Sequence, residues 1–290
     1  MESFAGKIAV VTGGGSGMGR ELVRQLAAEG CSVAACDVHR GAVAETEELA
    51  KEGAPAGTKV TSHSCDVADE AQMLRFRDEV LAAHAADHVD LVFGNAGIGG
   101  GGSFIADPRE QWESVFAVDF WGVYYCARAF LPLLIKSTEG VLVNTSSING
   151  FWASLGQGVP HTAYSTAKFA VKGFSEALIE DLRVHAPHVR VAVVMPGHVA
   201  TNIVANSMLA FGVPEADAFE ANKGFRDSAP LSAGGAATVI LDGVRSGAWR
   251  ILVGADAHGL DQWVRAYPED AYDYAKLGAA RQDPTVATAE

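Results

Sequence analysis

The chain has 290 residues and a formal net charge of −13, with 22 Lys and Arg against 35 Asp and Glu. This acidic balance disfavours binding to nucleic acid or to an anionic membrane surface, and no apolar run is long enough to span a bilayer. The cysteines show no metal-ligand spacing, so we expect buried thiols and no metal site at Cys31, Cys36, Cys65 and Cys126. With no basic-then-apolar leader before the first predicted strand, a cytoplasmic location is expected.

The first predicted elements are a strand, a glycine-rich turn and a helix. Residues 7–11 form the apolar, β-branched run typical of a buried parallel strand, and residues 20–29 carry apolar side chains at helical spacing. Glycines let the backbone approach a pyrophosphate, and a helix N-terminus offers unpaired N–H donors. We therefore expect the turn to bind a dinucleotide through Gly13, Ser16, Gly17, Met18 and Gly19. A glycine-rich turn without a ligand is the less favoured alternative.

The second predicted strand, residues 31–36, is followed by an acidic residue. Asp37 lies eighteen residues after Gly19, where a carboxylate accepts hydrogen bonds from the ribose hydroxyls of NAD and repels the 2′-phosphate of NADP. An arginine such as Arg40 can accommodate that phosphate, but the glycine turn itself contains no basic residue. The sequence favours NAD over NADP, with Asp37 and Val38 beside the adenosine. Alternatively, Asp37 only begins the next turn.

The alternation of strands and helices continues to about residue 253, and no Pro- or Ser-rich linker interrupts it. This alternation predicts one α/β domain, a doubly wound (Rossmann) parallel sheet of about seven strands with helices on both faces. We expect the domain to span residues 1–280. Residues 281–290 lack a core-forming pattern and are expected to form a disordered tail.

A tyrosine and a lysine stand four residues apart on a later predicted helix, so Tyr164 and Lys168 share one face of it. A phenol titrates near pH ~10, and a nearby ammonium favours the phenolate. Lowering its pKa to about 7.5 would require roughly 3.4 kcal/mol of differential stabilisation. This spacing also recurs by chance on exposed helix faces, so its weight depends on the rest of the chain.

Together with the glycine turn and Asp37, the pair Tyr164-x-x-x-Lys168 resembles the short-chain dehydrogenase/reductase family. Four further segments match motifs of that family, in the family's order, within about residues 7–201. They are Asp66-Val67 after the third predicted strand, Asn95-Ala96-Gly97 after the fourth, Ser147 after the fifth, and Pro196-Gly197-His198-Val199-Ala200-Thr201 after the sixth. Each match alone is weak, but their coincidence is specific.

The resemblance implies an NAD-dependent short-chain alcohol dehydrogenase or ketone reductase that acts on CH–OH groups of a small-molecule substrate. It implies that Tyr164 removes the hydroxyl proton and that Ser147 steadies the developing oxyanion. Lys168 would lower the pKa of the phenol and hold the nicotinamide ribose. The remaining cofactor contacts that the resemblance implies come from Asp66, Val67, Asn95, Ala96, Gly97, Pro196, Gly197, Val199 and Thr201.

Two departures from the family's pattern concern the neighbourhood of this site. The family usually has an asparagine that distorts the helix after the fourth strand, and this chain has Asp119 there. Asp119 has nearly the same shape, so whether it replaces that asparagine in the proton relay stays open. The spacing between Ser147 and Tyr164 is also longer than the family commonly shows. The surplus residues, 150–160, are glycine-rich and can bulge without moving either anchor.

The segment after Thr201 is expected to form a substrate lid over about residues 202–228. Its apolar residues are Ile203, Val204, Met208, Leu209, Phe211, Val213, Phe219 and Phe225, and the surplus loop adds Phe151 and Trp152. A pocket walled in this way favours a lipophilic alcohol or ketone. It is equally open that these residues only pack the lid onto the sheet. His161 and His198 are expected near the site in supporting roles.

Two other functions are weighed against the alcohol dehydrogenase. An NADPH-dependent ketoacyl-type reductase would need a 2′-phosphate site and a basic patch for an acidic carrier, and Asp37 and the negative charge argue against both. A catalytically silent NAD-binding sensor is disfavoured because Ser147, Tyr164 and Lys168 are all present. The resemblance also implies a homo-oligomer, built from helices near residues 108–136 and 161–185. A tetramer is favoured over a dimer.

Overall fold

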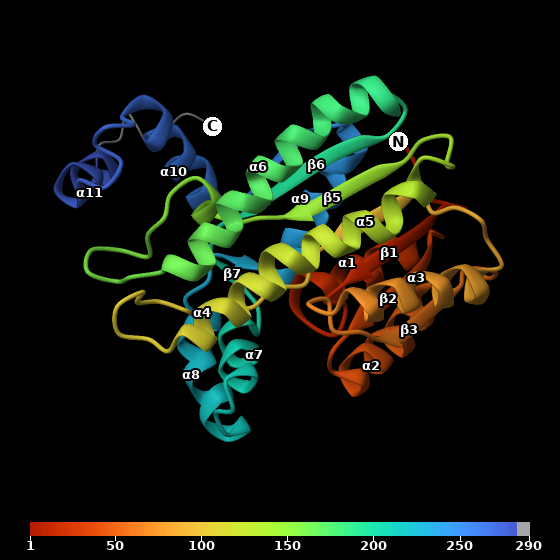
Figure 1. Ribbon diagram of the computed structural model, residues 1–290, viewed down its shortest axis with the longest axis horizontal. Helices are drawn as coiled ribbons and strands as arrows, with labels where there is room; N and C mark the ends of the chain where they lie inside the picture. Colours follow the sequence, from red (N-terminus) through yellow and green to blue (C-terminus); the bar gives the residue numbers. More distant parts are fainter. Residues whose placement is uncertain (283–290) are drawn as a thin grey trace.

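A computed structural model of the protein describes residues 1–282, and its centre is a parallel sheet of seven strands (Figure 1). The order across the sheet is β3-β2-β1-β4-β5-β6-β9. The strand bounds are β1 Ile8–Thr12, β2 Ser32–Asp37, β3 Val60–Ser64, β4 Leu91–Gly94, β5 Val141–Thr145, β6 Arg190–Pro196 and β9 Arg250–Val253. All six pairings are parallel. The predicted doubly wound α/β sheet of about seven strands is therefore confirmed.

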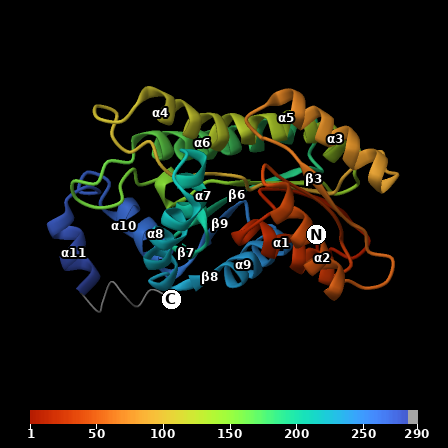
Figure 2. The ribbon, with the colours of Figure 1, turned by 90° about the horizontal axis from the view of Figure 1, so that it is seen from below.

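Helices cover both faces of this sheet, as Figure 2 shows. One layer contains α1 Gly17–Ala28, α2 Arg40–Gly53 and α9 Ala233–Ser246. The other contains α3 Glu70–His84, α4 Arg109–Phe116, α5 Gly122–Leu134 and α6 Thr162–His185. A single π-helical turn, Ala117–Trp121, joins α4 to α5. These three layers make one domain.

The sheet separates two apolar cores, which explains why its strands read as continuous apolar runs. In β1, Val11 packs toward the layer of α1 and α9, beside Leu22 and Ile240. Its neighbour Val10 points the opposite way and packs beside Phe76 and Phe130. Successive side chains of a strand alternate between faces, so a sheet covered on both sides needs apolar residues at every position.

Smaller elements stand at one end of the sheet. The segment expected to form a lid contains α7 Ile203–Ala210 and α8 Glu215–Asp227, between the short paired strands β7 Val199–Ala200 and β8 Leu231–Ser232. Two further helices, α10 Ala255–Ala266 and α11 Tyr274–Gln282, follow β9 and lie beyond α6 in Figure 1. Since α11 continues to Gln282, the expected tail at 281–290 is helical in its first two residues, and the rest lies outside the described residues.

The strand order reverses on the two sides of β1, and such a switch point opens a crevice at the carboxyl ends of the strands. Thr12, the last residue of β1, holds the two sides of this crevice together. Its buried hydroxyl accepts hydrogen bonds from the backbone N–H groups of Asn95 and Ala96 at 3.0 and 3.1 Å and donates to the Phe93 carbonyl. The glycine turn after β1 and the turn after β4 thereby face each other across the crevice.

None of the helices in residues 1–282 combines the length and apolarity needed to cross a membrane. Within the same residues, no group of three or more His, Cys, Asp and Glu side chains is arranged to hold a metal ion. The four cysteines are buried and unpaired, as expected.

Candidate active site

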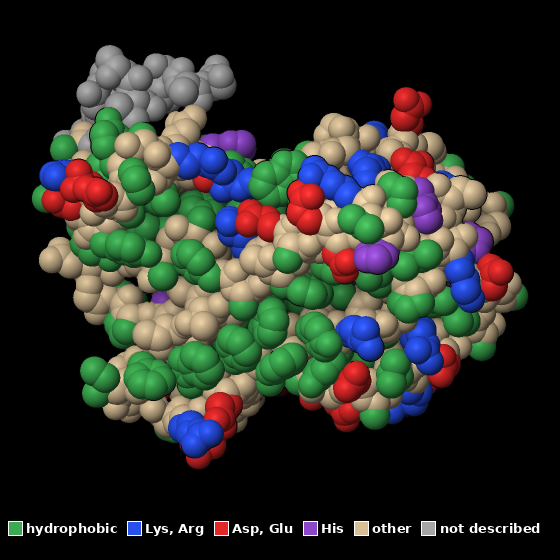
Figure 3. All heavy atoms as spheres, turned by 45° about the horizontal axis from the view of Figure 1, so that its top comes forward, with side chains coloured by type: hydrophobic (Ala, Val, Ile, Leu, Met, Phe, Trp, Pro, Cys, Tyr) green, Lys and Arg blue, Asp and Glu red, His purple; other side chains and the backbone are tan. Residues whose placement is uncertain are grey.

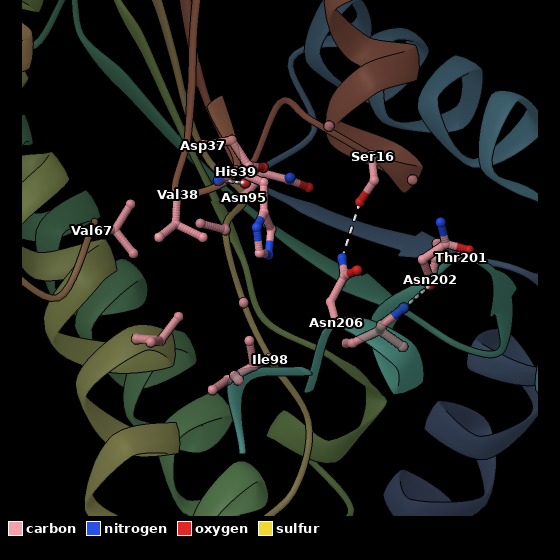
Figure 4. A pocket seen from close by; sticks show the side chains of 18 of the residues that line it. Ser16, Asp37, Val38, His39, Val67, Asn95, Ile98, Thr201, Asn202 and Asn206 are labelled. Carbon is pink, nitrogen blue, oxygen red and sulfur yellow. Dashed lines mark hydrogen bonds between the residues drawn. The ribbon is translucent and has the colours of Figure 1, made fainter. Parts of the chain in front are cut away.

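A cavity of about 300 Å³ opens at the switch point, and segments from both halves of the sheet line it (Figure 4). Most residues expected to bind the cofactor lie on its wall. These are Gly13, Ser16, Gly17, Met18, Gly19, Asp37, Val38, Asp66, Val67, Asn95, Ala96, Gly97 and Thr201. Five short segments that are far apart in the sequence are thus brought together at one cavity.

The glycine turn has the geometry that a pyrophosphate site requires. Gly13 and Gly17 have positive φ values of 67° and 54°, which favour glycine. A Cβ atom on Gly19 would lie 2.1 Å from the Gly13 carbonyl oxygen, so no side chain fits at this position. Ser16, the N-cap of α1, makes no side-chain capping hydrogen bond, and no acidic residue occupies the first turn. The helix therefore presents free donors and its positive dipole end to the cavity.

At the far end of the cavity, the Asp37 carboxylate is held in place by two backbone groups. It accepts hydrogen bonds from the N–H of Gly15 at 3.0 Å and of His39 at 2.9 Å. Arg40 is absent from the lining. Arg20, the other basic side chain near the turn, is turned toward Glu45 at 2.6 Å and the Gly15 carbonyl. The wall at this point carries negative charge, with no arginine facing it.

Ser147, Tyr164 and Lys168 come together beside the cavity without lining it. The Lys168 ammonium lies 5.3 Å from the centre of the Tyr164 ring and donates to the Thr145 carbonyl at 3.2 Å. The Ser147 hydroxyl lies close enough to the Tyr164 phenol to lower the pKa of the phenol. The Lys168 backbone is fixed as well, since its carbonyl accepts a hydrogen bond from the Ser146 hydroxyl at 2.7 Å. The predicted group is therefore assembled at the end of β5 and the start of α6.

Asp119 joins this group as the partner of Lys168. One of its oxygens lies 3.3 Å from the ammonium, and the other accepts a hydrogen bond from the N–H of Ile98 at 2.8 Å. Both charged side chains are almost completely buried. Asp119 lies in the π-helical turn between α4 and α5, a local distortion often found at functional sites. The helix distortion expected at this position is thus present with Asp in place of Asn.

Burial and charge act in opposite directions on these groups. Burial raises the pKa of Tyr164 above its ordinary value, while the Lys168 ammonium and the Ser147 hydrogen bond lower it and Asp119 raises it. As expected, the charge of Lys168 lowers the pKa of Tyr164. The effect of burial is larger, so the pKa of Tyr164 is raised overall. Burial lowers the pKa of Lys168, yet Asp119 and Tyr164 more than offset this, so its pKa is raised and the ammonium persists. Burial also raises the pKa of Asp119, against the opposing charge of Lys168.

The segment Pro196–Thr201 reaches the cavity only through Thr201, so Pro196, Gly197 and Val199 do not line it. A contact with α10 explains why the backbone of this segment has a glycine. The N–H of His198 donates to the Asp256 carboxylate at 2.6 Å, and a Cβ atom on Gly197 would lie 2.2 Å from that carboxylate. The glycine lets the chain pass close to α10.

The two histidines expected near the site have supporting contacts. His161 stacks on the Tyr164 ring with 4.6 Å between ring centres, and burial lowers the pKa of His161 to about 4, which keeps it neutral. The His198 ring bonds to the Phe225 carbonyl at 2.7 Å and packs on the Phe225 ring. His161 therefore fixes one face of the phenol, and His198 fastens α8.

Ile203, expected in the wall of a substrate pocket, does line the cavity. Sequence reasoning missed several other residues of the cavity wall: His39, Cys65, Ile98, Ser114, Val118, Asn202, Asn206 and Ala210. His39, Cys65 and Ile98 are chain neighbours of predicted residues, and that adjacency could have found them. Asn206 is different, because its amide crosses the cavity to donate to the Ser16 hydroxyl at 3.1 Å (Figure 4). No local pattern marks a contact between residues so far apart.

The expectation that Trp152 walls the substrate pocket is wrong. Its side chain is buried against Leu260 and Trp263 of α10, and Phe151 packs beside it under Arg250. The surplus loop therefore packs against the helices after β9 through these two rings.

Comparison with known proteins gives the same family that the arrangement of the cavity and its neighbouring residues indicates. The model of the family described as short chain dehydrogenase matches residues 7–210. The oxidoreductase SadH of Mycobacterium tuberculosis is 36% identical over 287 residues, which cover 98% of this chain and 99% of that protein. The chain belongs to the short-chain dehydrogenase family.

Solved structures agree with this assignment. A short-chain dehydrogenase/reductase from Burkholderia phymatum, crystallised with NAD, has a TM-score of 0.80 and 30% identity, with 93% of this chain and 95% of that chain covered. A metagenomic short-chain oxidoreductase crystallised with NADP has a TM-score of 0.59 and 31% identity, with 67% of this chain and 83% of that chain covered. This short-chain dehydrogenase is thus an oxidoreductase of a family that uses nicotinamide dinucleotides.

Replacing Asp119 with Asn tests the electrostatic role of the buried carboxylate. Asp119 raises the pKa of Tyr164, so Asp119→Asn should lower that pKa and shift the midpoint of the pH–rate profile for alcohol oxidation to lower pH. The measurement is kcat against pH for both proteins. Asp181→Asn, an exposed carboxylate on α6, serves as the control and should leave the midpoint in place. An unmoved midpoint in Asp119→Asn would mean that only the shape of this side chain matters.

Proposed function

We propose that this protein is an NAD(H)-dependent dehydrogenase that interconverts a secondary, lipophilic alcohol and its ketone. The observation that carries the proposal is the assembly of Ser147, Tyr164 and the buried Lys168–Asp119 pair beside a cavity lined by the glycine turn and Asp37. The glycine cradle and the free donors of α1 fit a dinucleotide pyrophosphate.

Each catalytic side chain has a role that its surroundings support. The Tyr164 phenolate accepts the proton of the substrate hydroxyl and returns it to the carbonyl in the reverse direction. Ser147 donates a hydrogen bond to the substrate oxygen and stabilises its developing negative charge. Lys168 favours the phenolate by its charge and would hold the nicotinamide ribose. Bound NAD supplies the hydride acceptor, and this transfer is the cofactor's own chemistry.

The polarity of the cavity wall supports a lipophilic substrate. Its acidic side chains, Asp37 and Asp66, stand at the adenosine end, where a cofactor would cover them. The wall near α7 carries the apolar side chains of Ile98, Val118 and Ile203 beside the polar side chains of Asn202 and Asn206. Two nearby loops expose further apolar side chains, among them Phe104, Ile105, Leu155 and Val159. An apolar wall with a few fixed polar groups is the usual character of a small-molecule site.

The proposal is tested by a screen of alcohols and ketones with NAD(H) and NADP(H), followed at the nicotinamide absorbance band. The set should pair terpenoid, steroid, aromatic and long-chain substrates with small polar analogues of the same functional group. The proposal expects turnover with NAD(H) and a higher kcat/KM for the lipophilic member of each pair. A preference for carrier-linked ketoacyl substrates with NADPH would support the reductase alternative. Dinucleotide binding without turnover of any substrate would support a silent sensor.

Cofactor preference provides a sharper prediction, because the Asp37 carboxylate would repel a 2′-phosphate. NAD(H) should bind at least ~10-fold more tightly than NADP(H), or about 1.4 kcal/mol, as measured by fluorescence titration. Asp37→Asn should narrow this gap, since it removes the charge and keeps an acceptor for the N–H of Gly15. Arg40→Ala, the control, should leave the gap unchanged. Equal affinities in the unaltered protein would contradict the assignment.

We also propose a homo-oligomer, assembled through the layer of α4, α5 and α6. A chain of contacting rings runs along this layer through Trp112, Phe116, Phe120, Trp121, Tyr124 and Phe174. Trp121, Ile135 and Phe169 remain exposed to solvent at 41–42%. Figure 3 shows a band of hydrophobic side chains on this side of the molecule. Apolar patches of this kind mark protein interfaces.

Light scattering at micromolar concentration should therefore give the mass of a tetramer or a dimer of the 30.3 kDa chain. The double variant Trp121→Glu and Phe169→Glu should lower that mass, because burying two carboxylates in an apolar interface is costly. Trp249→Glu, which alters an equally exposed tryptophan near β9, should not change it. A monomer in the unaltered protein would reject the proposed assembly.

A further inference from the structure

The chain beyond the family-matched residues 7–210 folds back onto the loop between Ser147 and Tyr164. We name residues 271–277, at the start of α11 and just before it, the C-terminal brace. Three hydrogen bonds join the brace to the loop. They are Trp152 Nε1 to the Ala271 carbonyl at 2.7 Å, the Ala153 N–H to the Tyr272 hydroxyl at 3.0 Å, and Ser154 Oγ to the Tyr274 hydroxyl at 2.6 Å.

Apolar packing reinforces these hydrogen bonds. The Trp152 indole is 6% exposed and belongs to a small core of its own with Leu260, Trp263, Ala271 and Leu277. Its ring lies nearly parallel to that of Tyr272, at 10°, and meets the Tyr274 ring edge-on. This core is separate from the two cores that flank the sheet, so the loop is held from outside the central fold.

Asn149 connects this held loop to the catalytic serine. Its buried side-chain amide donates to the carbonyls of Trp152 at 3.0 Å and of Ser154 at 2.8 Å, two of the three residues that are hydrogen-bonded to the brace. Its backbone N–H donates to the Ser147 hydroxyl oxygen at 3.1 Å. With one lone pair of that oxygen occupied, the Ser147 hydroxyl hydrogen is left to point toward the phenol or a substrate oxygen.

The loop needs contacts from outside because its own sequence does little to restrict its conformation. Residues 150–160 contain Gly150, Gly156 and Gly158 and no charged side chain. A glycine-rich loop has a large conformational entropy when it is free. The brace restricts its conformations at Trp152 and Ser154, and Asn149 transmits that restriction to Ser147.

We propose that the C-terminal brace, through Asn149, positions the hydroxyl of Ser147 for hydrogen bonding to the substrate oxygen. Trp152, Tyr274 and Asn149 are then positioning residues that act through Ser147. The inference rests on the proposed alcohol dehydrogenase function, because it assigns the brace a part in that reaction. It extends the determinants of the site to a segment at the other end of the chain.

The test is the double variant Trp152→Phe and Tyr274→Phe, which removes two hydrogen-bonding groups and keeps an aromatic ring at each position, a smaller one at 152. We expect kcat to fall about tenfold, as for the loss of one hydrogen bond to the reacting oxygen, while the Kd for NADH stays unchanged. The pH midpoint for alcohol oxidation should also rise, because the Ser147 hydrogen bond lowers the pKa of Tyr164. Tyr267→Phe is the matched control, since its hydroxyl makes no hydrogen bond to this loop among the described residues.

A second measurement is independent of activity. The backbone N–H of Asn149 donates a hydrogen bond to the Ser147 hydroxyl oxygen. Its rate of hydrogen exchange should increase in the double variant and stay unchanged in Tyr267→Phe. If exchange and kcat in the double variant match those of the control, the brace does not position Ser147 and the inference is wrong. If the unaltered protein turns over no substrate, the proposed function fails instead, and unchanged Asn149 exchange would then also reject the brace.

Discussion

The proposed catalytic group depends on one buried ion pair, between Lys168 on α6 and Asp119 in the π-helical turn. Each group would be costly to bury alone, and removing one partner of such a pair typically costs about 3–5 kcal/mol. The pair keeps an ammonium charged beside Tyr164, where burial otherwise disfavours the phenolate. The remaining features of the site either hold this pair in place or bring a substrate and cofactor to it.

The parallel sheet provides this support by its topology. The end of β5 brings the Thr145 carbonyl to the ammonium, and the turn after β4 brings the N–H of Ile98 to the carboxylate. The same turn is tied to β1 through Thr12, directly before the glycine turn. The cavity and the group of Ser147, Tyr164 and Lys168 are therefore positioned by one set of strand ends.

Much of the cavity wall could be predicted from the sequence because its determinants are local. A glycine that must approach a carbonyl, such as Gly19, and an acidic residue at a strand end, such as Asp37, appear as short patterns. The bond from Asn206 to Ser16 and the burial of Trp152 under α10 could not be predicted in this way. They join residues more than a hundred positions apart, and only the folded chain decides which apolar surface a loop will cover.

The central claim is that Tyr164 transfers the proton, and the variant Tyr164→Phe tests it most directly. The ring still fills its place under His161, so dinucleotide affinity should stay close to that of the unaltered protein. Turnover of the best alcohol substrate should fall by about 10²- to 10⁴-fold, the usual contribution of a positioned acid–base group. Loss of turnover with intact NADH binding is the predicted result, and turnover at the unaltered rate would contradict the whole catalytic assignment.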